Sequence, residues 1–434
     1  MKAAIALLED EKERLIWISG RAGTGKSTFL QYLKGEIRPR DTVYLAPTAV
    51  AALTIGGQTI HSFFWIDPNE KAYFDTRLDP DREGRLYPLL AMVETIVVDE
   101  ISMVRADLLD EMDRRMRKAK SQPRLPFGGA RLVLFGDAYQ LPPVEPDPFN
   151  PAGELFARLY KSPFFFSSKV LRTRARTIRH VEFTRVFRHV ETDFLYTLDR
   201  CRSGVVTEAD LDLLQSRVLP EGKKPPADHI VLTAKKDEAQ RLNRYRIDAL
   251  PGPGRNYAAS SSGRFANALN DEDLPAPREL ALKVGTRVMF TANGPGSRWA
   301  NGGLATVAGL EDERVTLHDE TGEFCVGPHV WRKSRFTLCS GRLAEEAVDE
   351  YRQYPFVPGW AITIHRAQGR TLEKVFVDLS RGAFAAGQAY VAISRVTRLD
   401  GLLLRARPRA RDFFVNERVT DFLEYIKAGA ETDR

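Results

Sequence analysis

The sequence LIWISGRAGTGKST, residues 15–28, decides the fold of this chain. Its second half carries the pattern G-x-x-x-x-G-K-[ST], in which glycines let the backbone turn tightly around phosphate oxygens and the lysine adds positive charge. The apolar run before it predicts a buried strand, and the residues after it have helical spacing, which is the context that a phosphate-binding loop needs. The hydroxyl of Ser27 would hold Mg²⁺. The predicted nucleotide contacts are Gly20, Ala22, Gly23, Thr24, Gly25, Lys26, Ser27 and Thr28.

Length and composition indicate a soluble protein of several domains. The chain has 434 residues, of which 43% are hydrophobic and 28% charged, values that are ordinary for globular proteins. The formal net charge of +6 fits a polyanionic partner only if it is concentrated in a groove. Three scattered cysteines favour a reducing compartment over disulfides or zinc. We see no membrane span and no signal peptide, and we expect a cytoplasmic protein, associated with the nucleoid if it is bacterial.

Polar side chains follow further apolar runs that we predict to be strands. Asp99 and Glu100 end one run, as in nucleotide hydrolases that present a magnesium-binding Asp and a water-orienting Glu. Gln140 follows another run, residues 131–135, where its amide could contact a γ-phosphate. Loops at the carboxyl ends of strands are where α/β sheets place ligands, so we expect these polar groups to meet at one edge.

Three other stretches have less specific patterns. Residues 56–65 combine His61 with adjacent aromatic rings, which could stack nucleic-acid bases or simply form part of the core. Residues 161–188 are basic and could contact phosphates, although most of these side chains individually fit a solvated surface. From residue 284 onward, short β segments separated by turns predict a small barrel-like insert.

Taken together, these blocks resemble superfamily-one helicases, and specifically the branch that contains the Pif family and the RecD-like 5′→3′ enzymes. The resemblance runs from about residue 17 to about residue 404 and includes FTRVFRH at 183–189, TIHRAQGRTL at 363–372 and YVAISR at 390–395. The sequences around Gln140, Gln368 and Arg395, in this order, are more specific than the phosphate loop.

The resemblance implies an α/β fold of two RecA-like P-loop NTPase domains, with a small 1B wedge and an SH3-like β insertion called 2B. The implied boundaries are 1–62 and 86–168 for domain 1A, 63–85 for the 1B wedge, 169–285 and 356–434 for domain 2A, and 286–355 for 2B.

The resemblance also implies ATP and Mg²⁺ as cofactors, with Ser27 and Asp99 holding the metal. Gly369 would join the nucleotide contacts, together with Gln140, Arg188 and Arg395. The implied catalytic residues are Lys26, Asp99, Glu100, Gln140, Arg188 and Arg395. The implied DNA contacts are Pro47, Thr48, His61, Phe63, Thr363, His365, Arg366 and Gln368.

By the same resemblance, the function would be ATP-driven 5′→3′ translocation on single-stranded DNA by a monomer. The substrates would be duplex, forked and G-quadruplex DNA, in replication, repair, recombination and telomere maintenance. The alternatives are a RecD-like repair helicase and a nucleotide-switched remodeller that binds single strands without unwinding. A plain phosphotransferase is disfavoured by the two arginine-bearing blocks far downstream.

Two departures from the family pattern matter. No glutamine precedes Gly20, where the family usually carries one that reads adenine, so either adenine selectivity differs or the natural N-terminus lies further upstream. Arg366 stands where many relatives carry Lys, a change that should keep phosphate contact and alter its geometry.

Overall fold

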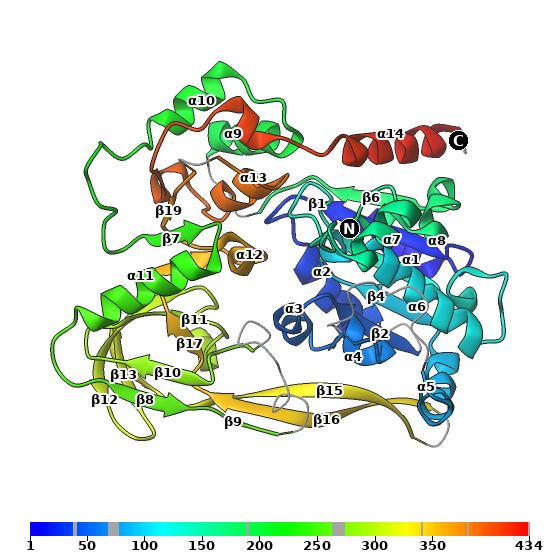
Figure 1. The fold of residues 1–434 in the computed structure, drawn as a ribbon, viewed down its shortest axis with the longest axis horizontal. Coiled ribbons are helices and arrows are strands. Elements are labelled where there is room, and N and C mark those ends of the chain that lie inside the picture. Colours follow the sequence, from blue (N-terminus) through cyan, green and yellow to red (C-terminus); the bar gives the residue numbers. More distant parts are fainter. Residues whose placement is uncertain are drawn as a thin grey trace. The chain divides into compact units, whose positions relative to one another are not determined.

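The computed structural model describes residues 1–37, 41–67, 78–187, 191–262, 274–339, 342–379 and 382–432 (Figure 1). It divides the chain into two compact units. The first unit consists of Met1–Phe187, Lys333–Val348 and Asn416–Arg434, and the second consists of Arg188–Arg332 and Asp349–Val415. No helix within the described ranges is both long enough and apolar enough to cross a membrane.

A six-stranded parallel sheet forms the centre of the first unit, in the order β3-β2-β4-β5-β1-β6. Every residue of β1, β2, β4 and β5 is buried, because helices cover both faces of such a sheet, and this explains their unbroken apolar runs. The strands are β1 (Leu15–Gly20), β2 (Thr42–Ala46), β3 (Gln58–Thr59), β4 (Thr95–Val98), β5 (Arg131–Gly136) and β6 (Arg179–Phe183).

Helices of the first unit, α2 among them, pack their apolar sides against this sheet. Phe29 and Leu30 of α2 are fully buried and share a core cluster with Ile16, Ile18 and Phe135 of the strands. The helices are α1 (Lys2–Glu9), α2 (Lys26–Tyr32), α3 (Ala49–Thr54), α4 (Ile60–Phe64), α5 (Pro80–Met92), α6 (Ala106–Ala119), α7 (Pro151–Leu159), α8 (Lys169–Arg172) and α14 (Glu417–Thr432).

The second unit contains a four-stranded parallel sheet in the order β18-β7-β19-β20. Its strands are β7 (Ile230–Thr233), β18 (Ala361–Thr363), β19 (Val375–Val377) and β20 (Leu402–Leu404). Its helices are α9 (Thr192–Ser203), α10 (Glu208–Gln215), α11 (Lys236–Asp248), α12 (Ile364–Ala367) and α13 (Gln388–Ile393).

Antiparallel strands make up the rest of the second unit. Five of them form a sheet in the order β14-β13-β12-β11-β17, as the alternating short segments and turns predicted. They are β11 (Arg287–Phe290), β12 (Leu304–Leu310), β13 (Val315–Asp319), β14 (Gly322–Val326) and β17 (Phe356–Pro358). The smaller sheets contain β8 (Arg255–Ala258), β9 (Ser260–Ser261), β10 (Glu279–Leu282), β15 (His329–Cys339) and β16 (Arg342–Gln353). Only the parts of β15 and β16 outside Lys333–Val348 belong to the second unit.

The limits of the two units differ from the predicted domain boundaries. Residues 169–187, predicted to begin domain 2A, belong to the first unit because β6 pairs in parallel with β1. The C-terminal helix α14 also belongs to the first unit, where Phe422 stacks on Phe166 with their ring centroids 4.3 Å apart. The segment Lys333–Val348, predicted as part of 2B, is likewise assigned to the first unit.

Candidate functional site

The phosphate loop lies between β1 and α2, as predicted. Gly23 and Gly25 have φ angles of 79° and 86°, a left-handed conformation that L side chains rarely adopt. The Nζ atom of Lys26 donates to the carbonyl oxygens of Gly20 and of Arg21, the latter at 3.0 Å. The ammonium group is therefore held on the inner side of the loop.

Gly20 is required because two neighbours approach it closely. A Cβ atom on Gly20 would lie 2.6 Å from the carbonyl oxygen of Phe183 and 2.7 Å from Oγ1 of Thr24, and its φ angle is 151°. The hydroxyl of Thr24 in turn donates to the carbonyl oxygen of Arg21 at 2.9 Å. The loop is thus closed on one side by the end of β6.

The two predicted carboxylates follow β4. The backbone N–H of Asp99 donates to the carbonyl oxygen of Leu45 at 2.9 Å, which fixes Asp99 beside β2. Burial, and then the neighbouring Glu100 carboxylate, raise the pKa of Asp99 to about 7, although Lys26 opposes the shift. Glu100 itself has φ 51° and ψ 46°, a left-handed conformation that is uncommon for a residue with a side chain.

Gln140 lies in a tight loop after β5. Its side chain is largely buried, and its backbone N–H donates to the carbonyl oxygen of Asp137 at 3.0 Å. Because β2, β4, β5 and β1 are adjacent and parallel, the residues that follow each of them lie at the same edge of the sheet. The predicted convergence of Lys26, Asp99, Glu100 and Gln140 at one edge is therefore confirmed by the strand order.

Phe187 is a residue of this site that the sequence did not single out. Its backbone N–H donates to the carbonyl oxygen of Gly23 at 3.0 Å, and its ring atoms lie 3.7 Å from where a Cβ atom on Gly25 would be. The side chain is 64% exposed, which is unusual for a phenylalanine held against a phosphate loop. The sequence offered one clue to Phe187, namely that it is an aromatic residue directly before Arg188. Arg188 lies outside the described residues.

The predicted DNA contacts of the first unit differ in their surroundings. Thr48 follows β2 and caps α3, with its hydroxyl oxygen accepting from the backbone N–H of Ala51 at 3.2 Å. Burial, and then the nearby Arg105, lower the pKa of His61 to about 4, so the imidazole is neutral at neutral pH.

Phe63 does not fit the prediction that it contacts DNA. Its ring is 2% exposed and packs edge-on against Phe64 and Phe336, with centroid separations of 5.1 and 5.7 Å. Phe63 and Phe64 are core residues, as the alternative interpretation of this aromatic cluster predicted. Neither ring has a face open for stacking with a base.

In the second unit, the predicted residues lie at the end of β18, on α12, in the loop after α12 and just after α13. The hydroxyl oxygen of Thr363 caps α12 by accepting from the backbone N–H of Arg366 at 3.1 Å, and Gly369 has φ 76°. Arg395 is only 2% exposed, and its guanidinium donates to the carbonyl oxygens of Ala367 and Arg370 at 3.3 and 3.2 Å. Arg395 thus fastens the loop that carries Gln368 and Gly369, and its contact with nucleotide phosphates stays a prediction.

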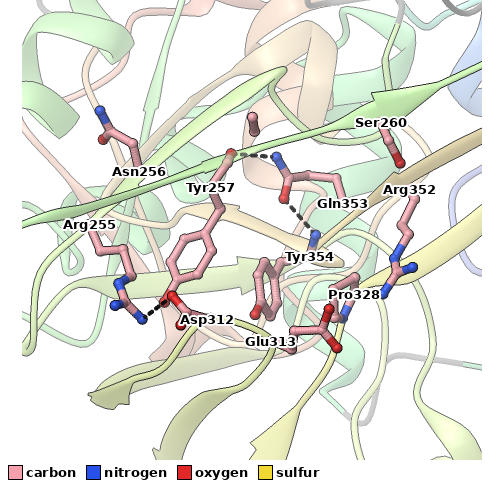
Figure 2. Close-up of a pocket in the computed structure, with 11 residues that line it drawn as sticks. Arg255, Asn256, Tyr257, Ser260, Asp312, Glu313, Pro328, Arg352, Gln353 and Tyr354 are labelled. Carbon is pink, nitrogen blue, oxygen red and sulfur yellow. Dashed lines mark hydrogen bonds and ion pairs between the residues drawn. The ribbon is translucent and has the colours of Figure 1, made fainter.

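The second unit also contains a pocket of about 360 Å³, which none of the predicted site residues lines (Figure 2). Gln353 orders one wall: its amide nitrogen donates to the carbonyl oxygen of Tyr257, and its amide oxygen accepts from the backbone N–H of Tyr354, both at 2.9 Å. Arg255 pairs with Asp312 at 3.2 Å. This pocket lies apart from the chemistry that the sequence motifs describe.

The fold and the site define a P-loop nucleotide-binding protein with two parallel sheets and polar side chains at the strand ends of the first. The model of the PIF1-like helicase family matches residues 1–210. The chain is 30% identical to the ATP-dependent DNA helicase Pif1 of Bdellovibrio bacteriovorus, over 95% of this chain and 88% of that protein. It is 33% identical to the ATP-dependent DNA helicase PIF1 of Mus musculus, over 90% of this chain and 57% of the mouse protein. The chain belongs to the PIF1-like helicase family.

Solved structures agree with this assignment. A double mutant of Pif1 helicase from Bacteroides has a TM-score of 0.88 and 30% identity, covering 99% of this chain and 96% of that one. Bacteroides Pif1 in complex with ADP-AlF4 has a TM-score of 0.86 and 31% identity, covering 98% and 96%. The predicted family and the predicted α/β fold with RecA-like domains are therefore confirmed. The chain spans 57% of the mouse and 62% of the human relative.

Proposed function

We propose that this chain is an ATP-dependent DNA helicase that translocates 5′→3′ on single-stranded DNA and unwinds duplex, forked and G-quadruplex DNA. The observation that carries the proposal is the edge of the first sheet, where Lys26, Asp99, Glu100 and Gln140 follow adjacent parallel strands. Related proteins with this fold are named ATP-dependent DNA helicases, and Bacteroides Pif1 was solved in complex with ADP-AlF3 and ssDNA.

The residues at this edge suit the hydrolysis of a nucleoside triphosphate. Lys26 and the loop N–H groups would bind the phosphates, Glu100 would orient the attacking water, and Gln140 would contact the γ-phosphate. The donors fit a magnesium ion, because Asp99 is a half-buried carboxylate next to the second carboxylate of Glu100, and a cation stabilises such a pair. Mg²⁺ held by Asp99 and Ser27 would supply positive charge to the nucleotide phosphates.

We also propose that Phe187 stacks on the nucleobase. It is an exposed aromatic ring anchored by its backbone to the phosphate loop, and aromatic faces stack on bases of any sequence. This contact would hold the base beside the phosphate loop.

The second unit would supply the coupling to DNA. Arg395 belongs to this unit and Lys26 to the first, so the proposed participation of Arg395 in hydrolysis would make turnover depend on both units. Arg188 is our second proposed arginine for this role. Thr48, Thr363 and Arg366 are our proposed contacts to the DNA backbone. Alternation between nucleotide states would then move the bound strand.

The test is strand displacement from two partial duplexes, one with a 5′ and one with a 3′ single-stranded tail, with ATP and Mg²⁺ at a fixed salt concentration. We expect displacement from the 5′-tailed substrate and none from Lys26→Ala, which should fold normally and lack hydrolysis. Displacement from the 3′ tail alone would overturn the polarity. DNA-stimulated turnover without displacement from either substrate would favour the nucleotide-switched remodeller.

A further inference from the structure

Arg370 has an arrangement that the proposed function does not yet explain. It follows Gly369 in the loop after α12, and it is only 8% exposed. Its guanidinium makes no hydrogen bond or ion pair with any residue that the structure describes, and its Nη1 atom is fully buried without a partner. An unpaired buried charge destabilises a folded protein, because the ion loses its hydration without gaining a partner.

The surroundings of Arg370 do not offset this charge. Burial, and then the positive charge of Arg366, lower the pKa of Arg370 to about 10, and no carboxylate acts in the opposite direction. The side chain therefore remains protonated at neutral pH. A third arginine, Arg395, donates through Nη1 to the carbonyl oxygen of Arg370 at 3.2 Å, which fixes the backbone of the loop. Cationic side chains thus gather here without an anion among the described residues around Arg370.

An apolar side chain of similar length would pack at this position without the cost of a buried charge. Replacing buried charges by apolar residues is often stabilising, so an arginine here suits a role in which its charge meets an anionic ligand. The planar guanidinium fork matches phosphate oxygens, and its fixed charge does not depend on pH near neutrality.

We propose that Arg370 binds a phosphate group of a ligand, adding a cationic contact to the loop that carries Gln368 and Gly369. This proposal rests on the proposed function, which offers two sources of the same chemistry. One source is the terminal phosphate of the nucleotide, and the other is a backbone phosphate of single-stranded DNA.

The experiment compares Arg370→Met and Arg370→Lys with wild type and with Arg244→Met. Arg244 is an exposed arginine on α11 of the same unit, so its variant removes one positive charge from the surface. Three quantities are measured: the Tm of the ligand-free protein, the affinity for ATPγS and for ADP with Mg²⁺ in the absence of DNA, and the affinity for labelled oligothymidylate without nucleotide over a series of salt concentrations.

We expect Arg370→Met to raise the Tm and to weaken binding of one ligand about 10- to 100-fold, the range for hydrogen bonds to a charged group. Arg370→Lys should fold and lose less affinity for that ligand than Arg370→Met does. Lysine keeps the positive charge but lacks the planar guanidinium that binds two phosphate oxygens. If Arg370→Met loses affinity for ATPγS and not for ADP, the phosphate that Arg370 binds is the terminal phosphate of the nucleotide. A loss for oligothymidylate, with a salt slope that is smaller by about 0.7, identifies a backbone phosphate.

Two results would overturn the proposal. If wild type binds both probes and Arg370→Met binds them as Arg244→Met does, the buried charge serves no ligand. If Arg370→Met lowers the Tm, the guanidinium has a structural partner and the premise is wrong. Failure of wild type to bind either probe would instead contradict the proposed function, and this proposal with it.

Discussion

Glu100 combines a proposed catalytic role with a backbone conformation that few residues with side chains adopt. Its φ of 51° costs on the order of 1 kcal/mol, and such strain persists where the surrounding structure enforces it. The side chain follows β4 directly beside Asp99, where a carboxylate can orient a water molecule against the nucleotide. Strain at this position is consistent with selection for placement of the carboxylate rather than for stability.

Glu100→Gln should therefore abolish most hydrolysis and spare nucleotide binding. The amide keeps the shape of the side chain and loses the basic oxygen, which lowers turnover by about 10²–10⁴ for a general base. DNA-stimulated ATP turnover and ATPγS affinity would be measured on the same preparations. Glu94→Gln, an exposed glutamate immediately before β4, serves as the matched control. Normal turnover in Glu100→Gln, or an equal loss in the control, would remove Glu100 from the catalytic group.

Phe187→Ala should weaken binding of ATP and ADP equally, because both carry the same base. Stacking on an aromatic ring is worth about 1–3 kcal/mol per base, or about 5- to 150-fold in affinity. Phe149→Ala is the matched control, since Phe149 is 93% exposed in the same unit. Affinities would be measured by titration without DNA. Unchanged affinity in Phe187→Ala would show that the ring only covers the phosphate loop.

These residues also show which parts of the site could be predicted from the sequence. Lys26, Asp99, Glu100 and Gln140 were found because each follows an apolar run, and parallel strands bring such positions to one edge. The burial of Phe63 could not be found in this way, because one of its partners is Phe336, far along the chain.

At the scale of elements, local patterns located β1, β4 and β5 of the first parallel sheet, because these strands are apolar runs in which every residue is buried. The assignment of β6 to a unit was not predictable, because its residues are mostly half-buried and its place is set by pairing with β1. The C-terminal helix α14 poses the same difficulty, since it packs on Phe166 more than 250 residues earlier in the sequence.

One connection between elements depends on a single carboxylate. Asp210 of α10 is 1% exposed and accepts hydrogen bonds from Thr197 at 2.7 Å, from Arg200 at 2.6 Å and from the backbone N–H of Thr207 at 2.9 Å. Burial alone would raise the pKa of Asp210, but the hydrogen bonds from Arg200 and Thr207 hold it well below its usual range. The carboxylate therefore ties α9 to the start of α10.

Asp210→Asn should lower the free energy of unfolding at neutral pH by about 1–2 kcal/mol, because the buried carboxylate loses charged hydrogen bonds while its partner Arg200 is 38% exposed and screened by solvent. Because the folded pKa is depressed, the stabilisation is present above the unfolded pKa of about 3.9 and is lost as the pH falls through the folded value. The difference from wild type should thus shrink below about pH 4. Asp212→Asn, on the exposed side of α10, should cost less than about 0.5 kcal/mol. Denaturant unfolding at several pH values would check this, and a pH-independent difference would contradict it.

At the scale of the whole molecule, the net charge of +6 is small and its distribution matters more than its size. The basic stretch before residue 188 is partly neutralised by local contacts: Arg179 pairs with Glu13 at 2.9 Å, and the Lys169 ammonium lies 5.5 Å from the centre of the Tyr160 ring. Arg179 and Lys169 therefore behave as ordinary surface side chains, which is the second interpretation that the sequence allowed for this stretch. The other basic side chains of this stretch stay candidates for phosphate contact, and Arg366 is our proposed contact in the second unit.

If single-stranded DNA binds through a few such cations, its affinity must fall as salt rises, because each neutralised phosphate releases condensed counterions. The slope of log K against log salt is about −0.7 per contacted phosphate for single strands. Arg366→Ala should make this slope less negative by about 0.7 and weaken binding to oligonucleotides of different sequence alike, since backbone contacts carry no sequence information. Arg244→Ala, which removes an equal charge from exposed α11, should leave the slope unchanged. A slope that both variants change equally would show that binding responds to net charge rather than to a contact at Arg366, and an unchanged slope in Arg366→Ala would remove this residue from the DNA interface.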